Sequence, residues 1–319
     1  MNPYETEIYK VVPIPNKGMG MIAKVKIPVG TRIFAETPLI RTKSDAKEIE
    51  EALSTKTKEE QEAFHRLFNA HPDTMGPFLG PFYSNALTID ETKGGMFLLG
   101  SRMNHDCSPN VKHTWNPRLD QVTVHAVRDI EAGEEILTTY IDLHKSRTER
   151  QKILLEHFGF KCYCSVCSVE ERKIRKISDL RRKQLAYYDR TMAKMCIVNP
   201  RGALRALRHR IHIAHEELLF GRLDIIALLD AFRLCVIHGD FERASIFAKK
   251  GTKAISLYEG TDSEKYLKIS KYIENPRSHA LAEGVPALPL FLEEDDELSD
   301  LEDNLWGCKL EEDVYSDTD

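Results

Sequence analysis

The chain has 319 residues, of which 42% are hydrophobic and 30% are charged, and its formal net charge at pH 7 is −5. Its length allows two domains, or one domain with a substantial appendage, and its composition is that of an ordinary soluble protein. The longest apolar runs, such as Ile225 to Leu229, are far too short to span a bilayer, which excludes a membrane-spanning protein.

The N-terminus and the cysteine content indicate where the protein works. Residues Met1 to Lys10 hold three charges and no apolar core, so we expect no secretory signal. The expected location is therefore the nucleus, the cytoplasm or both, where thiols stay reduced. In that setting the seven cysteines are better explained as metal ligands, core residues or nucleophiles than as disulfides.

The charge is unevenly distributed along the chain. Residues Glu293 to Asp319 contain 13 acidic residues and one lysine, a net charge of −12. The preceding residues carry 44 basic and 37 acidic side chains, a net charge of +7. A basic body with an acidic tail indicates either a polyanionic partner or self-association of the tail. The alternative is a solvated tail that only aids solubility.

The first forty residues have the character of short strands. Gly and Pro separate three such segments, which are Tyr9 to Pro15, Met21 to Ile27 and Ile33 to Ile40. The pattern then changes, because Ser44 to Ala70 is charged and its apolar residues recur at helical spacing. This stretch predicts one or two amphipathic helices inserted between strands.

Strand character returns after the insert, at Met96 to Leu99, Val111 to Trp115, Gln121 to Val127 and Glu135 to Tyr140. The partial alternation of Val122 to Val127 predicts a half-buried strand. Arg147 to His157 predicts a short helix that leads into a cluster of cysteines. From Lys173 to Ile273 the pattern is helical and similar to antiparallel tetratricopeptide-type pairs, although no 34-residue repeat is evident. The chain after Asn275 is expected to be poorly ordered.

Four segments carry the chemistry, and their order along the chain is as informative as their content. They are Lys17-Gly-Met-Gly-Met-Ile-Ala23, Arg102-Met-Asn-His-Asp-Cys-Ser-Pro-Asn110, Gly133-Glu-Glu-Ile-Leu-Thr-Thr-Tyr140 and Phe158-Gly-Phe-Lys-Cys-Tyr-Cys-Ser-Val-Cys167. Over Val11 to Ser168 this series resembles the SET-domain protein-lysine methyltransferases, most closely the SET-and-MYND-like and fungal branch. The cysteine-rich MYND finger of that branch is missing, because no cysteine precedes Cys107.

The resemblance implies an α+β fold with a strand-rich, knotted SET core. In this interpretation residues 1–142 form the SET domain with a helical insert at about 43–82, and residues 143–170 form a post-SET zinc-binding lid. A helical, tetratricopeptide-like C-terminal domain would follow at 171–275, and an acidic, disordered tail at 276–319.

The implied function is S-adenosylmethionine-dependent protein-lysine N-methyltransferase, with a histone or non-histone protein as the substrate. The alternative is a catalytically inactive SET-fold protein-interaction module. The intact Tyr140, Asn104 and glycine segment favour the enzyme. Neither a membrane nor direct nucleic-acid binding is expected, because the basic run Arg172 to Lys176 is better explained as a solvated helical face.

The cysteines predict a structural zinc site. Cys162, Cys164 and Cys167 supply three thiolates, one fewer than the four that structural zinc prefers. Spacing alone leaves the fourth ligand open, although Cys196 and Cys235 lie in apolar helical settings typical of buried cysteine. The family resemblance implies that Cys107 is the fourth ligand, so that zinc ties the cofactor pocket to the lid. Clustered free thiols are the alternative.

The cofactor residues are implied by the resemblance, each beside a structural alternative. Gly18 and Gly20 permit close backbone approach, but two glycines between strands are most often only a turn. The family pattern implies cofactor contacts from Lys17, Gly18, Met19, Asn85, Asn104, His105, Tyr140 and Phe160. Structural packing competes with this role for the His105 side chain, and Phe158 is a candidate core residue beneath the zinc loop.

Tyr140 is the predicted catalytic residue. Methyl transfer needs a neutral amine, although a free lysine has a pKa of about 10.4, so desolvation must favour loss of the proton. A fixed tyrosine hydroxyl can orient that amine without adding a charge. Without the Gly133-Glu-Glu context, a tyrosine at the end of a strand would more often be a packing residue. Tyr83 is a further candidate for lining the lysine channel.

Overall fold

The computed structural model describes residues 4–290 and 301–309, which divide into two compact units. The described residues of Met1–Leu143 and Arg147–Ser168 form unit 1, and those of His144–Ser146 and Val169–Asp319 form unit 2. In the part of the chain that the structure describes, no helix is both long and apolar enough to cross a membrane.

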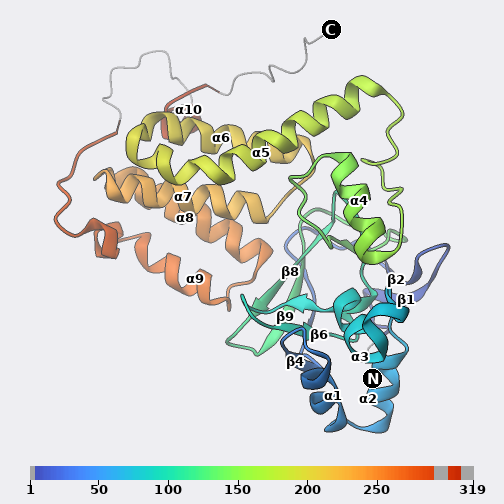
Figure 1. The fold of residues 1–319 in the computed structure, drawn as a ribbon. Coiled ribbons are helices and arrows are strands. Elements are labelled where there is room, and N and C mark those ends of the chain that lie inside the picture. The colour runs from blue at the N-terminus through green and yellow to red at the C-terminus, as the bar shows by residue number, and fades with distance from the viewer. Residues whose placement is uncertain (1–3, 291–300, 310–319) are drawn as a thin grey trace. The chain divides into compact units, whose positions relative to one another are not determined.

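Unit 1 is rich in short strands (Figure 1). Strands β1 (Tyr9–Ile14) and β2 (Gly18–Ala23) form an antiparallel hairpin. Two three-stranded antiparallel sheets follow, with the orders β3-β9-β8 and β4-β6-β5. Their members are β3 (Arg32–Glu36), β4 (Ile40–Thr42), β5 (Leu87–Thr88), β6 (Gly94–Met96), β8 (Val111–Asn116) and β9 (Gln121–Ala126). The short strands β7 (Asn104–His105) and β10 (Leu137–Thr138) pair in parallel.

The burial of β9 differs from the expected alternation. Its residues from Val122 to Ala126 are all buried. Strand β9 is the middle strand of its sheet, between β3 and β8, and Val124 and Ala126 belong to the main core cluster of unit 1. Thr123 and His125, which face the other way, are covered as well, so both faces of the strand are buried.

The helical insert between β4 and β5 consists of α1 (Ala46–Ser54), α2 (Lys58–His65) and α3 (Pro72–Asn85), which lie together beside β4 and β6 (Figure 1). Thr57 begins α2 with a capping box to Glu60, which satisfies two free backbone N–H groups. The third helix lies mostly within the helical insert expected at about 43–82, although Gly76, Pro77 and Pro81 disfavour a helix. The structure accommodates them with a kink at Gly76, where φ is 66°.

The predicted strand from Glu135 to Tyr140 is too long. Only Leu137 and Thr138 form the strand β10. The backbone N–H of Tyr140 donates to Nδ1 of the His105 ring, so a side chain takes the place of a partner strand there. This departure from strand pairing depends on a residue that is remote in sequence, which the local pattern could not reveal.

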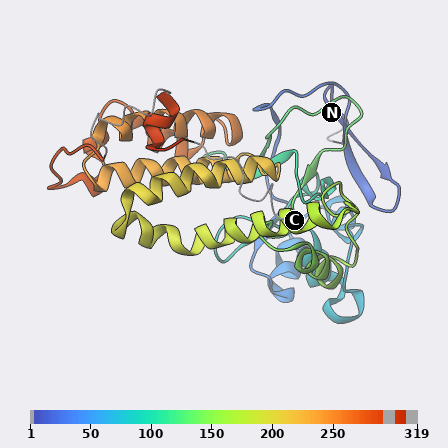
Figure 2. The ribbon, with the colours of Figure 1, turned by 90° about the horizontal axis from the view of Figure 1, so that it is seen from above.

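Helix α4 (Arg147–Phe158) completes unit 1, and long helices dominate unit 2. Helix α5 (Arg172–Val198) packs on α6 (Pro200–Glu216), and α7 (Arg222–Ile237) packs on both α6 and α8 (Phe241–Tyr258). Figure 2 shows these four helices running side by side. The shorter helices α9 (Glu264–Ile269) and α10 (Leu301–Trp306) lie on α8 and α6 respectively.

The prediction of a disordered tail from residue 276 on is wrong for two described stretches. Pro276, Leu290, Leu305 and Trp306 are buried, and residues 301–306 form α10. These apolar side chains find a surface on the helices of unit 2, which the acidic composition of the tail does not indicate. The rest of the predicted tail, 291–300 and 310–319, lies outside the described residues.

A buried ion pair joins α5 to the end of α6. Arg182 is fully buried, and its Nε atom lies 2.9 Å from Oε2 of Glu217. Ser178 donates a hydrogen bond of 2.6 Å to the same carboxylate oxygen. The neighbouring pair of Arg181 and Glu216 is more exposed, with an N···O distance of 3.1 Å.

Replacing Glu217 with Ala is expected to lower the free energy of unfolding by about 3 kcal/mol, because it removes the carboxylate that faces a buried guanidinium. The matched change Glu216→Ala removes an exposed partner and should cost less than about 1 kcal/mol. Urea denaturation followed by far-ultraviolet circular dichroism measures both values. Equal losses for the two variants would show that burial of the pair is unimportant.

Candidate active site

Three of the four sequence motifs meet at one point of unit 1. The amide nitrogen Nδ2 of Asn104 donates to the carbonyl of Met19 at 3.3 Å and to Oε1 of Glu135 at 2.7 Å. The other carboxylate oxygen of Glu135 lies 2.7 Å from Nζ of Lys17. The Lys17 ammonium, the Glu135 carboxylate, the Asn104 amide and the Met19 carbonyl are thus held together. They come from the start of the β2 segment, from β7 and from the segment before β10.

The glycines of the first motif make this convergence possible. Gly18 has a φ of 75° at the start of β2, which a residue with a side chain adopts with strain. A Cβ atom on Gly20 would lie 2.8 Å from both Asn104 Nδ2 and Glu135 Oε1, and 2.5 Å from Ile14. The glycine segment is mostly the second strand of a hairpin and not only a turn, because Gly18–Ala23 pairs with β1 along its whole length.

A second asparagine of the same motif fixes the third motif. Asn110 is fully buried, and its Nδ2 donates to the carbonyl of Glu135 at 2.8 Å. Its Oδ1 accepts from the N–H of Leu137 at 2.7 Å. These two hydrogen bonds hold the segment that carries Glu135 beside Asn104. Asn110 belongs to the second sequence motif, but the sequence predicts no role for it.

His105 connects the site to the cysteine cluster. Burial lowers the pKa of His105 to about 4, so the ring is neutral at physiological pH. Its Nδ1 accepts from the Tyr140 N–H at 3.1 Å, which leaves the proton on Nε2, 3.4 Å from the sulfur of Cys107. Both ring nitrogens are engaged within the protein. These contacts favour structural packing, the alternative to the predicted cofactor contact, for the His105 side chain.

Tyr140 lies in an aromatic cluster. Its ring centroid is 5.1 Å from that of Phe158, 5.5 Å from that of His105 and 6.4 Å from that of Phe160. The hydroxyl donates a hydrogen bond of 2.8 Å to the carbonyl of Met103. Burial, followed by the Glu135 carboxylate, raises the pKa of Tyr140 above its ordinary value, so the hydroxyl stays neutral. Because its proton is committed to Met103, the oxygen offers its lone pairs to an incoming group.

The four predicted cysteines come together. The Sγ atoms of Cys107, Cys162, Cys164 and Cys167 all lie within 4.8 Å of one another, and those of Cys107 and Cys167 are 3.6 Å apart. Tetrahedral zinc with Zn–S bonds of about 2.3 Å requires sulfurs about 3.8 Å apart, so this cluster has the right size for one ion. The other cysteines are not part of the group, which agrees with the ligand set that the family resemblance implied.

Helix α4 supports the cluster with charge and hydrogen bonds. The buried guanidinium of Arg150 lies 3.3 Å from the sulfur of Cys107 and 4.0 Å from that of Cys167. Such a cation partly neutralises the excess negative charge of four thiolates around one divalent ion. Gln151 exchanges two hydrogen bonds with the backbone of Cys162, and Arg147 donates to the carbonyl of Cys167. In the sequence nothing distinguishes Arg150 from the other charges of its helix.

Two other predicted residues make contacts elsewhere. Asn85 donates both hydrogens of its amide, at 2.7 Å each, to the carbonyls of Phe68 and Pro81, which fastens the end of α3. Tyr83 is 37% exposed, and its hydroxyl lies 2.5 Å from Nδ1 of His157. Neither residue hydrogen-bonds to Asn104, Glu135 or Tyr140 among the described residues. Glu135, in contrast, is central to the site and was missed, although it stands inside the Gly133-Glu-Glu motif.

Comparison with known proteins agrees with this geometry. Residues 18–141 match the SET domain family. The chain is 99% identical, over all 319 residues of both proteins, to the histone-lysine N-methyltransferase set5 of Schizosaccharomyces pombe. It is 38% identical over 97 residues to the histone-lysine N-methyltransferase SET5 of Yarrowia lipolytica, which is 30% of this chain and 21% of that one. It is 33% identical over 132 residues to the N-lysine methyltransferase SMYD2 of Gallus gallus, which is 37% of this chain and 30% of that one.

These similarities extend over the Asn104, Tyr140 and glycine motifs that meet in the structure. They set aside the alternative of an inactive interaction module and confirm the expected enzyme. The chain belongs to the SET-domain family and is a protein-lysine N-methyltransferase.

Proposed function

We propose that S-adenosylmethionine, the methyl donor of the SET-domain family, binds beside the β1–β2 hairpin through Lys17, Gly18, Met19 and Asn104. The observation that carries this proposal is the meeting of the Met19 carbonyl, the Asn104 amide and the Glu135 carboxylate. The amino-acid end of the cofactor has both an ammonium and a carboxylate group. Lys17 and Glu135 offer one partner of each sign, 2.7 Å apart.

The remaining predicted contacts have different support. Phe160 is half-buried beside Tyr140 and His105, where an aromatic face can cover the cofactor's adenine. For His105 the proposed contact is through its main chain, since both ring nitrogens are engaged. For Asn85 the sequence pattern remains the only support.

Tyr140 is the proposed catalytic residue and a cofactor contact. Its hydroxyl is neutral, buried and oriented by Met103, and it stands among rings that exclude water. A lysine amine entering such surroundings loses hydration, which favours its uncharged, nucleophilic form. The hydroxyl oxygen can then hold the amine in line with the methyl carbon that the cofactor supplies. Burial raises the pKa of the hydroxyl, so it can orient the amine without adding a charge.

Cys107, Cys162, Cys164 and Cys167 are the proposed ligands of a structural zinc ion. The ion would join the end of β7 to the segment after α4 and so hold Phe158 and Phe160 against Tyr140. Protein thiolates would fill all four positions around the ion, so the site would be closed and its role structural.

A histone is the proposed substrate, and the nucleus the proposed site of action. The support is the similarity to the histone-lysine N-methyltransferase set5 of Schizosaccharomyces pombe, with which this chain shares 99% identity. Incubation with recombinant histones and labelled cofactor, followed by mass spectrometry of the labelled lysine, tests this proposal. Labelling of other proteins in cell extract but of no histone would contradict it.

The purified protein is expected to contain about one zinc ion per chain, since four thiolates form a closed tetrahedral site. Replacing Cys164 with Ser should remove most of the zinc and lower the midpoint of thermal unfolding, because metal binding contributes folding energy. The control Cys196→Ser alters a half-buried cysteine outside the cluster and should keep the metal. Elemental analysis and calorimetry measure both effects. Folded, cofactor-binding protein without metal would refute the zinc site.

Replacing Tyr140 with Phe should lower the rate of methyl transfer by roughly a hundredfold or more, because it deletes one positioned hydrogen-bonding group and keeps the ring. The affinity for S-adenosylmethionine should change little, since the proposed binding contacts remain. Asn104→Ala should instead weaken cofactor binding and transfer together. Calorimetry and single-turnover assays separate the two effects. Unchanged turnover in Tyr140→Phe would assign Tyr140 to packing alone.

A further inference from the structure

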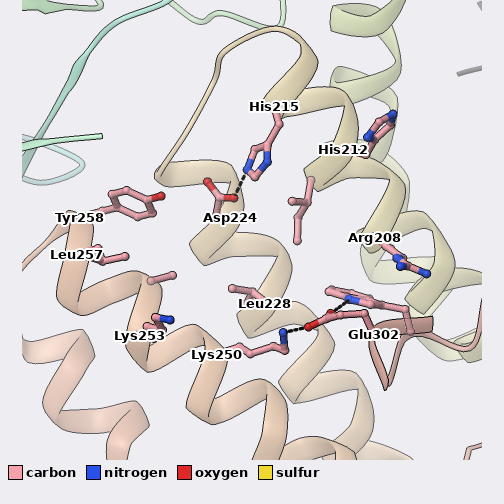
Figure 3. A pocket seen from close by; sticks show the side chains of 13 residues that line it. Arg208, His212, His215, Asp224, Leu228, Lys250, Lys253, Leu257, Tyr258 and Glu302 are labelled. Atoms are coloured by element: carbon pink, nitrogen blue, oxygen red, sulfur yellow. Dashed lines mark hydrogen bonds and ion pairs between the residues drawn. The ribbon is translucent and has the colours of Figure 1, made fainter. Parts of the chain in front are cut away.

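The helical unit contains a second candidate binding site, remote in sequence from the SET motifs. A groove with a volume of about 400 Å³ lies between α6 and α8, with α7 beneath it (Figure 3). Leu228 of α7 contributes an apolar floor, and Ile211 and Leu257 contribute apolar parts of the two walls. Glu302 and Trp306 of α10 close one end. We call this feature the α6–α8 groove.

Basic side chains line both walls of the groove. Helix α6 contributes Arg208, His212 and His215, and helix α8 contributes Lys250 and Lys253. Figure 3 shows the two sets facing the same space from opposite sides. A groove with an apolar floor and cationic walls complements a segment that carries carboxylates around an apolar side chain.

Helix α10 already binds one end of the groove in this manner. Asp303 lies 2.6 Å from Arg208, and Glu302 forms an ion pair with Lys250. Trp306 is buried, with its ring centroid 4.7 Å from that of Phe247 in an edge-on contact. The chain's own segment therefore shows which chemistry this surface accepts: acidic residues on the walls and an apolar anchor between them.

The other end of the groove has donors that α10 does not use. Lys253 is exposed and forms no ion pair with any other described residue. His212 of α6 and Tyr258 of α8 also line the groove (Figure 3). Burial and the Asp224 carboxylate raise the pKa of Tyr258 to about 12, so its hydroxyl is a neutral donor.

We propose that the α6–α8 groove binds an acidic peptide segment of a partner protein, placed next to α10. The carboxylates of the peptide would pair with Lys253 and His212, and an apolar side chain would cover Leu228. A nucleic acid would offer phosphates but no aliphatic side chain for the apolar floor at Leu228. An acidic peptide that also carries apolar residues complements both the cations and the floor, so it fits better than a nucleic acid.

The test uses the full-length protein and a fluorescein-labelled peptide with the sequence of residues 293–307, which is acidic and contains Leu and Trp. Fluorescence anisotropy at low salt should show saturable binding. Lys253→Glu should weaken the affinity at least about tenfold, because it reverses a charge at a desolvated contact. The matched variant Lys249→Glu reverses an exposed charge on the same helix, outside the groove, and should change the affinity less than about twofold.

Further variants and ligands in the same binding assay distinguish the proposal from its alternatives. Equal affinities for Lys253→Glu and Lys249→Glu would overturn the proposal, once thermal unfolding shows both variants folded. Loss of binding in Lys250→Glu but not in Lys253→Glu would also overturn it, because the peptide would then merely replace α10. A labelled single-stranded RNA of equal length that binds more tightly, with the same dependence on Lys253, would assign the groove to nucleic acid instead. A peptide with Asn and Gln in place of its acidic residues should not bind.

Discussion

The active site depends on the close approach of Asn104 to β2, which is possible only because Gly20 has no side chain. The two contacts of the Asn104 amide, to Met19 and to Glu135, join the hairpin to the segment before β10. Asn110 fixes the same segment from its other side. Three parts of the chain that are far apart in sequence are thereby held within hydrogen-bonding distance, and the cofactor surface proposed here is what they form together.

The cysteine cluster continues this arrangement toward Tyr140, the proposed catalytic residue. His105 follows Asn104 directly and contacts both the Tyr140 backbone and the sulfur of Cys107. The segment that supplies the other three cysteines also supplies Phe158 and Phe160, which pack around Tyr140. Loss of the proposed zinc ion would therefore affect the surroundings of the Tyr140 hydroxyl through the packing of these rings, and not through any direct contact with the substrate.

Unit 2 is held together differently, by helix packing with polar contacts at selected points. Arg182 and Glu217 link α5 to the end of α6 inside the unit. On the surface of α6 and α8, the cations that pair with α10 belong to a longer basic groove. The acidic C-terminal segment and the basic body, which appear in the sequence only as a difference in net charge, meet there in specific ion pairs.

The sequence by itself determined the family, the order of the motifs and most of the long helices. Glycines, cysteines and amphipathic periodicity are local signals, so each of them can be recognised from the sequence alone. Only the tertiary structure decided the contacts between segments: that Glu135 and Arg150 belong to the site, that the His105 ring serves Tyr140 and Cys107, and that Asn85 holds the end of α3. A charged or polar side chain looks the same in a sequence whether it faces water or a partner a hundred residues away. The physical reason is that burial and pairing, which give such a residue its role, are properties of the folded chain.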